Sequence, residues 1–129
     1  MTIRLLDNDE LALRWGEIEP QIKRAVDKGI GESSTYDLFL ECLNNVSQCW
    51  THEDGYCITR IVNYSQYKQL QIVAGGGKNW FGSGWEMKDV IEQFAKDIGC
   101  RNVAIWGRPG WKRVLKDYHE PYTILVKEL

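Results

Sequence analysis

The chain has 129 residues, a formal net charge of -2, 43% hydrophobic residues and 12% aromatic residues. This composition argues against disorder, and the slightly negative charge argues against broad, nonspecific nucleic-acid binding while leaving room for a local basic patch. The length suits one domain, residues 1–129, with its own core. No apolar run approaches the ~20 residues that cross a bilayer, and the N-terminus lacks a signal peptide's apolar centre. We expect a soluble, cytoplasmic protein with no membrane partner.

The first third of the chain predicts one strand followed by two helical segments. Residues 2–6 form the short apolar strand, and Asp7 or Asn8 can cap the helix after it. Pro20 breaks the helical pattern and suits the first position of a second helix, which Gly29 and Gly31 end. The first helix has an imperfect apolar stripe of Leu11, Leu13, Trp15 and Ile18.

A further helix follows the capping residues Ser33, Ser34 and Thr35, with Asp37 in its first turn. Its apolar residues recur at helical spacing, and they are Tyr36, Phe39, Leu40, Leu43 and Val46.

Three strands are then predicted at residues 48–51, 56–63 and 67–74, forming an antiparallel meander. The turn at residues 52–55 contains His52 and Glu53, and its Gly55 is free to take positive φ.

The meander leads into a strand, a glycine-rich turn, a helix and a strand, at residues 67–74, 75–77, 85–98 and 102–106. Such an order is normally a parallel, right-handed crossover. Ser83 can cap this helix, and Glu86 follows at capping-box spacing. Glycines before a helix N-terminus favour an anion site, because unpaired N–H groups and the helix dipole point there.

The C-terminal part predicts a turn at residues 107–110, a basic amphipathic helix at 111–118 and a last strand at 122–127. The predicted fold class is therefore α+β (α/β), with a mixed central sheet, an antiparallel N-terminal meander, a parallel β-α-β crossover and flanking helices.

The four cysteines contain no CxxC pair, so the sequence predicts no metal site. We expect them to be reduced packing residues.

This order of elements resembles the GCN5-related N-acetyltransferase (GNAT) fold over nearly the whole chain. The best local match comprises residues 69–73, the loop, the helix ending Asp97-Ile98-Gly99-Cys100, and residues 101–106. The ending, residues 110–127, looks like GNAT-like proteins of phages and prophages, in which the enzyme signature is often eroded and some members are thought to be virion components.

The resemblance implies acetyl-CoA as cofactor, and the chain departs from the family at two places. The family's pyrophosphate loop is Arg/Gln-x-x-Gly-x-Gly/Ala. Gly82 and Gly84 keep that relation, but Asn79 stands at the first position and Lys78 is one position off. The position of the family's general-acid tyrosine falls near Leu115, and Tyr118 is a loose substitute one turn further on.

Carried over by this resemblance, the backbone near Val73 holds the pantetheine or the thioester carbonyl, and the glycine loop holds the pyrophosphate. Tyr118 is the candidate acid, and Glu53 is a turn former that could also bind the amine. The candidate cofactor-binding residues are Ile72, Val73, Ala74, Lys78, Gly82, Ser83, Gly84, Arg108 and Lys112.

Each of these features also has a purely structural explanation. The glycines can let a tight loop pass over aromatic side chains, and the basic residues can form a solvated helix face. His52 and His119 are expected to be exposed turn residues, with a role as base as the alternative. Trp80, Trp85, Trp106 and Trp111 can pack in the core, fill the cofactor cleft or anchor a protein partner.

Three functions follow. The first is a GNAT-like phage or prophage protein, a degenerate acyltransferase fold that acts in the virion or on a host protein. The second is an active acetyl-CoA-dependent N-acyltransferase. The third, least favoured, is nucleic-acid binding through the last basic helix.

Overall fold

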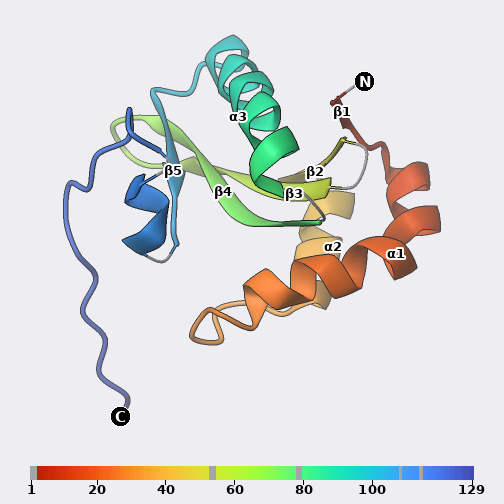
Figure 1. Ribbon diagram of the computed structural model, residues 1–129, viewed down its shortest axis with the longest axis horizontal. Helices are drawn as coiled ribbons and strands as arrows, with labels where there is room; N and C mark the ends of the chain where they lie inside the picture. The colour runs from red at the N-terminus through yellow and green to blue at the C-terminus, as the bar shows by residue number, and fades with distance from the viewer. Residues whose placement is uncertain (1–2, 53–54, 78–79, 108, 114) are drawn as a thin grey trace.

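A computed structural model describes residues 3–52, 55–77, 80–107, 109–113 and 115–129, with the backbone alone described at 77, 80–85, 109 and 110. The order of elements (Figure 1) is β1 (Arg4–Leu5), α1 (Asn8–Val26), α2 (Thr35–Leu43), β2 (Ser47–His52), β3 (Gly55–Asn63), β4 (Lys68–Gly77), α3 (Trp80–Asp97), β5 (Asn102–Ile105) and the 3-10 helix η1 (Pro109–Arg113).

The strands form one five-stranded sheet in the order β1-β2-β3-β4-β5. The pairs β1–β2, β2–β3 and β3–β4 are antiparallel, whereas β4 and β5 run parallel with Gln69 opposite Asn102 and Ile72 opposite Ile105. The predicted meander and the predicted parallel crossover are both confirmed, and so is the fold class.

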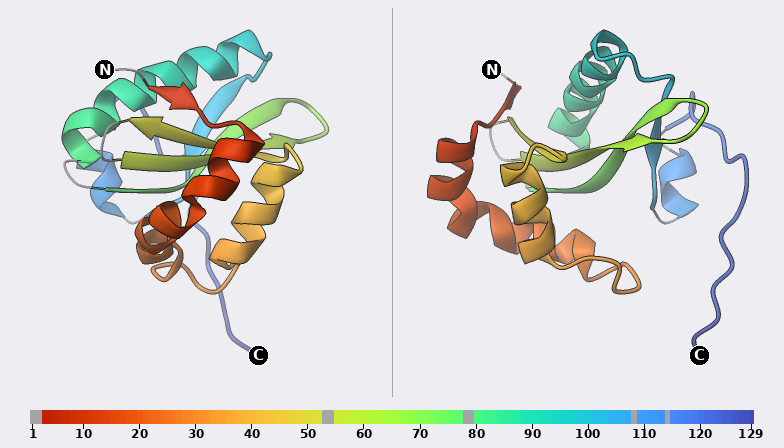
Figure 2. Two further views of the ribbon diagram at one scale, coloured as in Figure 1. Left: turned by 90° about the vertical axis from the view of Figure 1, so that its right-hand side faces the viewer. Right: turned by 180° about the vertical axis from the view of Figure 1, so that it is seen from behind.

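Helices cover both faces of this sheet. Figures 1 and 2 show α1 and α2 on one face and α3 on the other. Each face has its own buried cluster. The α1/α2 cluster includes Leu11, Ile18, Ile22, Leu38, Cys42, Tyr56, Ile58 and Ala74. The α3 cluster comprises Trp50, Cys57, Leu70, Met87, Ile91 and Ala95. Among the described residues, no helix has both the length and the apolarity needed to cross a membrane.

The predicted break at Pro20 is wrong, because α1 continues through it. Asp7 caps this helix by accepting from the Glu10 N–H at 2.8 Å, as expected. Figure 1 shows α1 bent along its length, and an internal proline is a usual cause of a bend because it removes one helical hydrogen bond. The helix persists because one face is buried, at Leu11, Ile18 and Ile22, while the expected Leu13 is 87% exposed.

Helix α2 begins as predicted, and its buried face matches the predicted one in part. Ser34 and Asp37 form a capping box, with each side chain accepting from the other residue's N–H. Leu38 and Cys42 are buried, and the expected Phe39 and Leu43 pack half-buried against the same cluster. The expected Tyr36, Leu40 and Val46 are exposed. The packing of α2 against β2 and α1 selects this face.

Helix α3 starts earlier than predicted, at Trp80 instead of Trp85. Ser83 therefore lies inside the helix and does not cap it. Its buried face consists of Met87, Ile91 and Ala95.

The predicted C-terminal helix and strand do not form. Residues 109–113 make only a single short 3-10 helix, and residues 118–129 have neither helix nor strand. Pro109 and Gly110 begin this segment, and glycine is a poor helix former. A strand also needs a neighbour for its hydrogen bonds, and no strand among the described residues pairs with residues 122–127.

The glycines at the end of β4 allow α1 to approach the sheet closely. A Cβ atom built on Gly76 would lie 2.7 Å from the main-chain oxygen of Gln21 in α1. Real Cβ atoms do not come so near, so a side chain there would force the helix and the strand apart. The predicted glycine-rich turn at residues 75–77 is wrong, because these residues continue β4 and are needed where α1 meets the strand.

We predict that Gly76→Ala lowers the free energy of unfolding by about 1–3 kcal/mol, the usual cost of overpacking. The matched control is Gly16→Ala in α1, where no atom lies within 4 Å of the new Cβ. That substitution should raise stability by about 0.5–1 kcal/mol, because alanine is the better helix former. Urea unfolding measures both, and a Gly76→Ala protein as stable as the parent would contradict the close contact.

Candidate functional site

The most distinctive feature of the sheet is a β-bulge in β4. Ala74 lies opposite Ile58, and the next pair joins Ile72 to Thr59, so Val73 has no partner of its own on β3. An extra residue bends the strand and increases its twist, and such bulges are common next to active sites.

The bulge reverses which side chains of β4 face α3. Before it, Leu70 and Ile72 pack with the α3 cluster. After it, Val73 and Ala74 both pack with the α1/α2 cluster. Two successive side chains on one face break the normal alternation of a strand. The side chains of Val73 and Ala74 therefore serve the core, and only their main chain is available to a ligand.

The bulge also coincides with the end of pairing to β5. The last parallel pair is Ile72 with Ile105, while β4 continues to Gly77. Beyond the unpaired Val73, residues 74–77 remain paired to β3 on one side. On the other side, no strand among the described residues pairs with residues 73–77. We call this stretch the open β4 edge, and it presents main-chain N–H and C=O groups that need partners.

Helix α3 starts just beyond this edge. Its first residues are Trp80, Phe81 and Gly82. N–H groups in a first helical turn have no intrahelical partner and favour an anion. The predicted Gly82 belongs to this turn. Ser83 and Gly84 come later, so their N–H groups can bond within the helix. The N–H groups without an intrahelical partner are therefore those of residues 80–82, about two residues before the predicted residues 82–84.

Helix α3 runs back along β4. Glu86 of this helix lies near the end of β2, since its Oε2 is 3.6 Å from His52 Nε2, and the end of the helix lies near the start of β4, where Lys68 Nζ donates to the Ile98 oxygen at 2.9 Å. His52 is level with Gly77 across β3. Glu92 is midway between Glu86 and Ile98 in sequence, and the bulge is midway between Gly77 and Lys68. Glu92 and the bulge are therefore at similar levels along the sheet.

Tyr118 is joined to α3 at this level. Its hydroxyl donates to Glu92 Oε2 at 2.7 Å, and Lys88 lies over its ring at 5.7 Å. Lys88 Nζ is also 3.1 Å from Glu92 and 3.4 Å from Asp117. Burial, followed by the hydrogen bond to Glu92, raises the pKa of Tyr118 well above its ordinary value. The hydroxyl therefore keeps its proton at neutral pH.

Sequence reasoning missed Glu92 and Lys88. Both lie on the polar side of an amphipathic helix, and nothing in their spacing shows that a segment 26 residues away would dock there. Of these three residues, the sequence indicated only Tyr118 as a candidate.

His52 is buried, contrary to the expected exposed turn residue. It is the last residue of β2 and is 3% exposed. Within the part of the chain that the structure describes, neither ring nitrogen has a hydrogen-bond partner. Adjacent strands are ~4.8 Å apart, so His52 lies ~10 Å from Gly77 across β3, and the bulge is ~13 Å further along β4. This imidazole is too far from the bulge to take a proton there directly. His119 is exposed, as expected.

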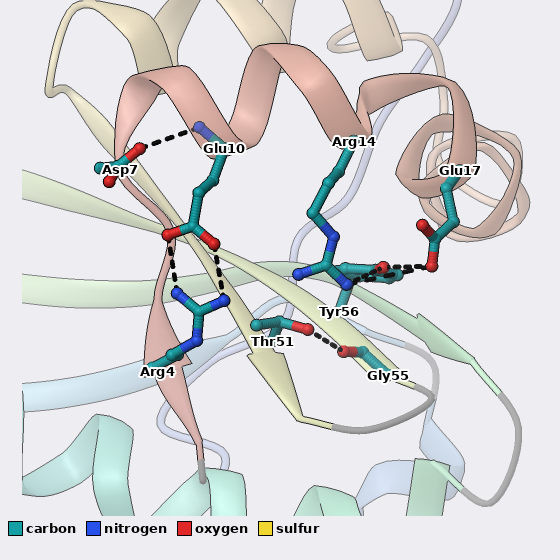
Figure 3. A network of polar contacts seen from close by, with 8 residues as sticks. All are labelled: Arg4, Asp7, Glu10, Arg14, Glu17, Thr51, Gly55 and Tyr56. Atoms are coloured by element: carbon teal, nitrogen blue, oxygen red, sulfur yellow. Dashed lines mark hydrogen bonds and ion pairs between the residues drawn. The ribbon is translucent and has the colours of Figure 1, made fainter.

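A second polar network fixes α1 over the end of β4 (Figure 3). Arg14 donates to the Tyr56 hydroxyl at 2.8 Å, and that hydroxyl donates to Glu17 at 2.7 Å. Tyr56 lies on β3 directly opposite Gly76. Burial and the hydrogen bond to Glu17 raise the pKa of Tyr56. Both hydroxyl contacts are used in holding α1, which makes the network a structural support of the open β4 edge.

The remaining predicted site residues are scattered. Glu53, Lys78 and Arg108 lie outside the described residues. Lys112 is in η1, where it forms an exposed ion pair with Glu120 at 2.9 Å. Ile72 is half-buried against the α3 cluster.

The cysteines are packing residues, as predicted for at least three of them. Cys42, Cys49 and Cys57 are buried, while Cys100 is half-buried. Burial raises the pKa of Cys42 to about 12 and that of Cys57 to about 12, and it raises the pKa of Cys49 further. A thiol with such a pKa is a poor nucleophile at neutral pH.

Comparison with known proteins identifies the architecture. No protein-family profile matches this sequence, and no curated protein matches it. Solved structures do match. A ribosomal-protein-alanine N-acetyltransferase from Brucella melitensis biovar Abortus 2308 has a TM-score of 0.71 at 12% identity, with 100% of each chain covered. An aminoglycoside acetyltransferase from an uncultured soil metagenomic sample has a TM-score of 0.69 at 14% identity, covering 99% of this chain and 95% of the other.

A GNAT family acetyltransferase from Staphylococcus aureus has a TM-score of 0.63 at 15% identity, covering 99% of this chain and 98% of the other. The chain has a GNAT-like fold. At these identities the similarity shows the fold alone, and the resemblance to phage proteins has no counterpart among these structures.

We predict that Cys100 reacts first when the native protein is treated with a thiol reagent at pH 8. The three buried thiols should react only in urea, because they are both inaccessible and protonated. Mass spectrometry after labelling measures this order. Rapid native labelling of Cys57 would contradict the packing, and a Cys100→Ser variant that takes up no label provides the control.

Proposed function

We propose that the protein is an acyl-CoA-dependent N-acyltransferase, with acetyl-CoA as the simplest donor. The observation that carries this proposal is the open β4 edge, which starts at a bulge and leads to the first turn of α3. The structural neighbours are acetyltransferases, which supports the same reading.

The shape of the edge suits the donor. A pantetheine arm is extended and contains amide groups, so it can bond to a strand edge much as an added peptide strand does. Residues 73–77 supply ~16 Å of such an edge at 3.3 Å per residue. The first turn of α3 then lies where the pyrophosphate would be held, through the N–H groups of residues 80–82.

The acyl thioester supplies an activated carbonyl carbon, and the chain has three tasks around it. Main-chain N–H groups near Val73 can polarise the carbonyl oxygen. The amine must also be bound and lose a proton; Glu53, which follows His52, is proposed as a carboxylate that binds the incoming amine, and not as the group that takes its proton at the bulge. Tyr118 is the proposed acid for the departing sulfur. Its hydroxyl is anchored on α3 through Glu92, level with the bulge.

The proposed cofactor contacts beyond the strand and helix are basic. Lys78, Arg108 and Lys112 would form a rim for the phosphates. Ser83 and Gly84 lose the role predicted for their N–H groups, which can bond within α3. Lys112 would first have to leave its exposed partner Glu120.

A non-catalytic role is the second candidate. It rests on two observations: the Tyr118 proton is already donated to Glu92, and residues 110–127 resemble GNAT-like phage proteins. In this case the fold would serve in a virion or bind a host protein, in the host cytoplasm or the particle, and acyl-CoA binding would be lost. Nucleic-acid binding loses its support, because the basic helix on which it depended does not form.

Calorimetric titration with acetyl-CoA tests the proposal, with micromolar binding expected. We predict that Gly82→Glu weakens this binding at least tenfold, because a carboxylate in the first turn of α3 repels the phosphates. The fold should tolerate it, since acidic residues suit a helix N-terminus. Gln93→Glu makes the same charge change ~16 Å along the helix and should leave binding unchanged. Undetectable binding by the parent protein would favour the non-catalytic role.

We further predict that Tyr118→Phe lowers kcat about a hundredfold, the usual contribution of a general acid, with acetyl-CoA affinity unchanged. Glu92→Gln is the matched control, because its amide oxygen can still accept from Tyr118. Steady-state kinetics over several amines measures both variants. Equal losses in the two variants would assign Tyr118 a structural role, and full activity of Tyr118→Phe would remove it from the mechanism.

A further inference from the structure

A buried histidine lies beneath the first turns of α3. His52 is the last residue of β2 and is 3% exposed. Neither of its ring nitrogens has a hydrogen-bond partner in the part of the chain that the structure describes. A neutral imidazole carries one N–H donor and one acceptor, and burying such groups unpaired costs free energy. A side chain placed at this cost needs an explanation beyond packing.

The sheet and α3 together fix the position of this ring. His52 shares a sheet face with Trp50, two residues earlier, and Trp50 belongs to the α3 cluster. The His52 Nε2 is 3.6 Å from Oε2 of Glu86. Glu86 follows residues 80–82 by four to six positions, which is ~6–9 Å along the helix. The imidazole is therefore on the order of 10 Å from the N–H groups that begin α3.

The described side chains around the ring include few that can carry charge. From α3, Glu86 is an ionisable neighbour, but its side chain is 70% exposed, so solvent screens its charge. From β3, the Cys57 thiol stays neutral because burial raises its pKa to about 12. The residue before β1 that packs on this face is the apolar Ile3. Glu53 and Lys78 lie outside the described residues.

A ligand on α3 would change the electrostatic field at this ring. Burial and the positive end of a helix both disfavour a cation. A pyrophosphate at the first turn of α3 would reverse that effect. One phosphate charge on the order of 10 Å away, at an effective dielectric constant of ~20, favours an imidazolium about tenfold. Histidine changes its charge near neutral pH, so a proton from the solvent can bind together with the ligand.

We propose that His52 takes up a proton when the acyl-CoA donor binds, and that the resulting imidazolium stabilises the donor's phosphates from beneath α3. This inference rests on the proposed function, because it takes the pyrophosphate at the first turn of α3 as the partner of the charge. His52 is then a binding residue that acts through the field, without contact and without a part in acyl transfer. The donor should bind more tightly as the pH falls from 8 to 6.

Calorimetric titration with acetyl-CoA, in buffers of different ionisation enthalpy, counts the protons taken up on binding. The parent protein should take up about half a proton per donor near pH 7. A phosphate monoester itself titrates near pH ~6, so 3′-dephospho-acetyl-CoA is titrated in parallel. His52→Gln keeps a polar side chain that cannot take up the proton, and it should abolish the uptake and weaken binding roughly five- to tenfold at pH 6. His119→Gln replaces an exposed histidine and should change neither.

Nuclear magnetic resonance of the parent protein gives a readout that needs no variant at position 52. The chain has two histidines, so His119→Gln assigns both imidazole signals. Saturating acetyl-CoA should move the titration of the His52 signal upward by about one pH unit. Binding without proton uptake, or an unchanged titration of the His52 ring, would overturn the inference and leave the proposed function standing. Failure of acetyl-CoA to bind at any pH would overturn both.

Discussion

The structure depends on one extra residue in β4. With Val73 unpaired on β3, the strand bends where its pairing to β5 stops, and it continues as an edge with free main-chain groups. If β4 had no bulge, it would stay in register with β3 along its whole length. A longer β5 could then pair with residues 73–77 and close the open β4 edge. The bulge therefore links the packing of the sheet to an edge where an extended ligand can bond to it.

The two faces of the sheet support this edge in different ways. On one face, Gly76 and the Arg14–Tyr56–Glu17 network bring α1 onto the end of β4. On the other, Met87, Ile91 and Ala95 hold α3 along the sheet, so that its first turn follows the open edge. Structures at 12–15% identity share this fold although no sequence profile matches the chain.

The C-terminal segment shows the limits of local preference. Residues 122–127 have the alternation of a strand, yet they form none in the isolated chain, because a strand is defined by its partner. Residues 111–118 have an amphipathic pattern, but only a short 3-10 helix forms, and the chain is instead fixed by Leu115, Tyr118 and their contacts with α3.

The sequence alone determined the order of the main elements, the antiparallel meander and the parallel crossover, because hydrophobic periodicity and capping residues are local signals. It also placed the candidate donor site at the end of β4. The tertiary structure decided the rest. Contacts between distant segments determine which face of α2 is buried and allow α1 to continue past Pro20. They also set the start of α3 and bury His52. They also placed Val73 in a bulge and brought Tyr118 to Glu92, since these outcomes depend on pairing and packing that no local pattern contains.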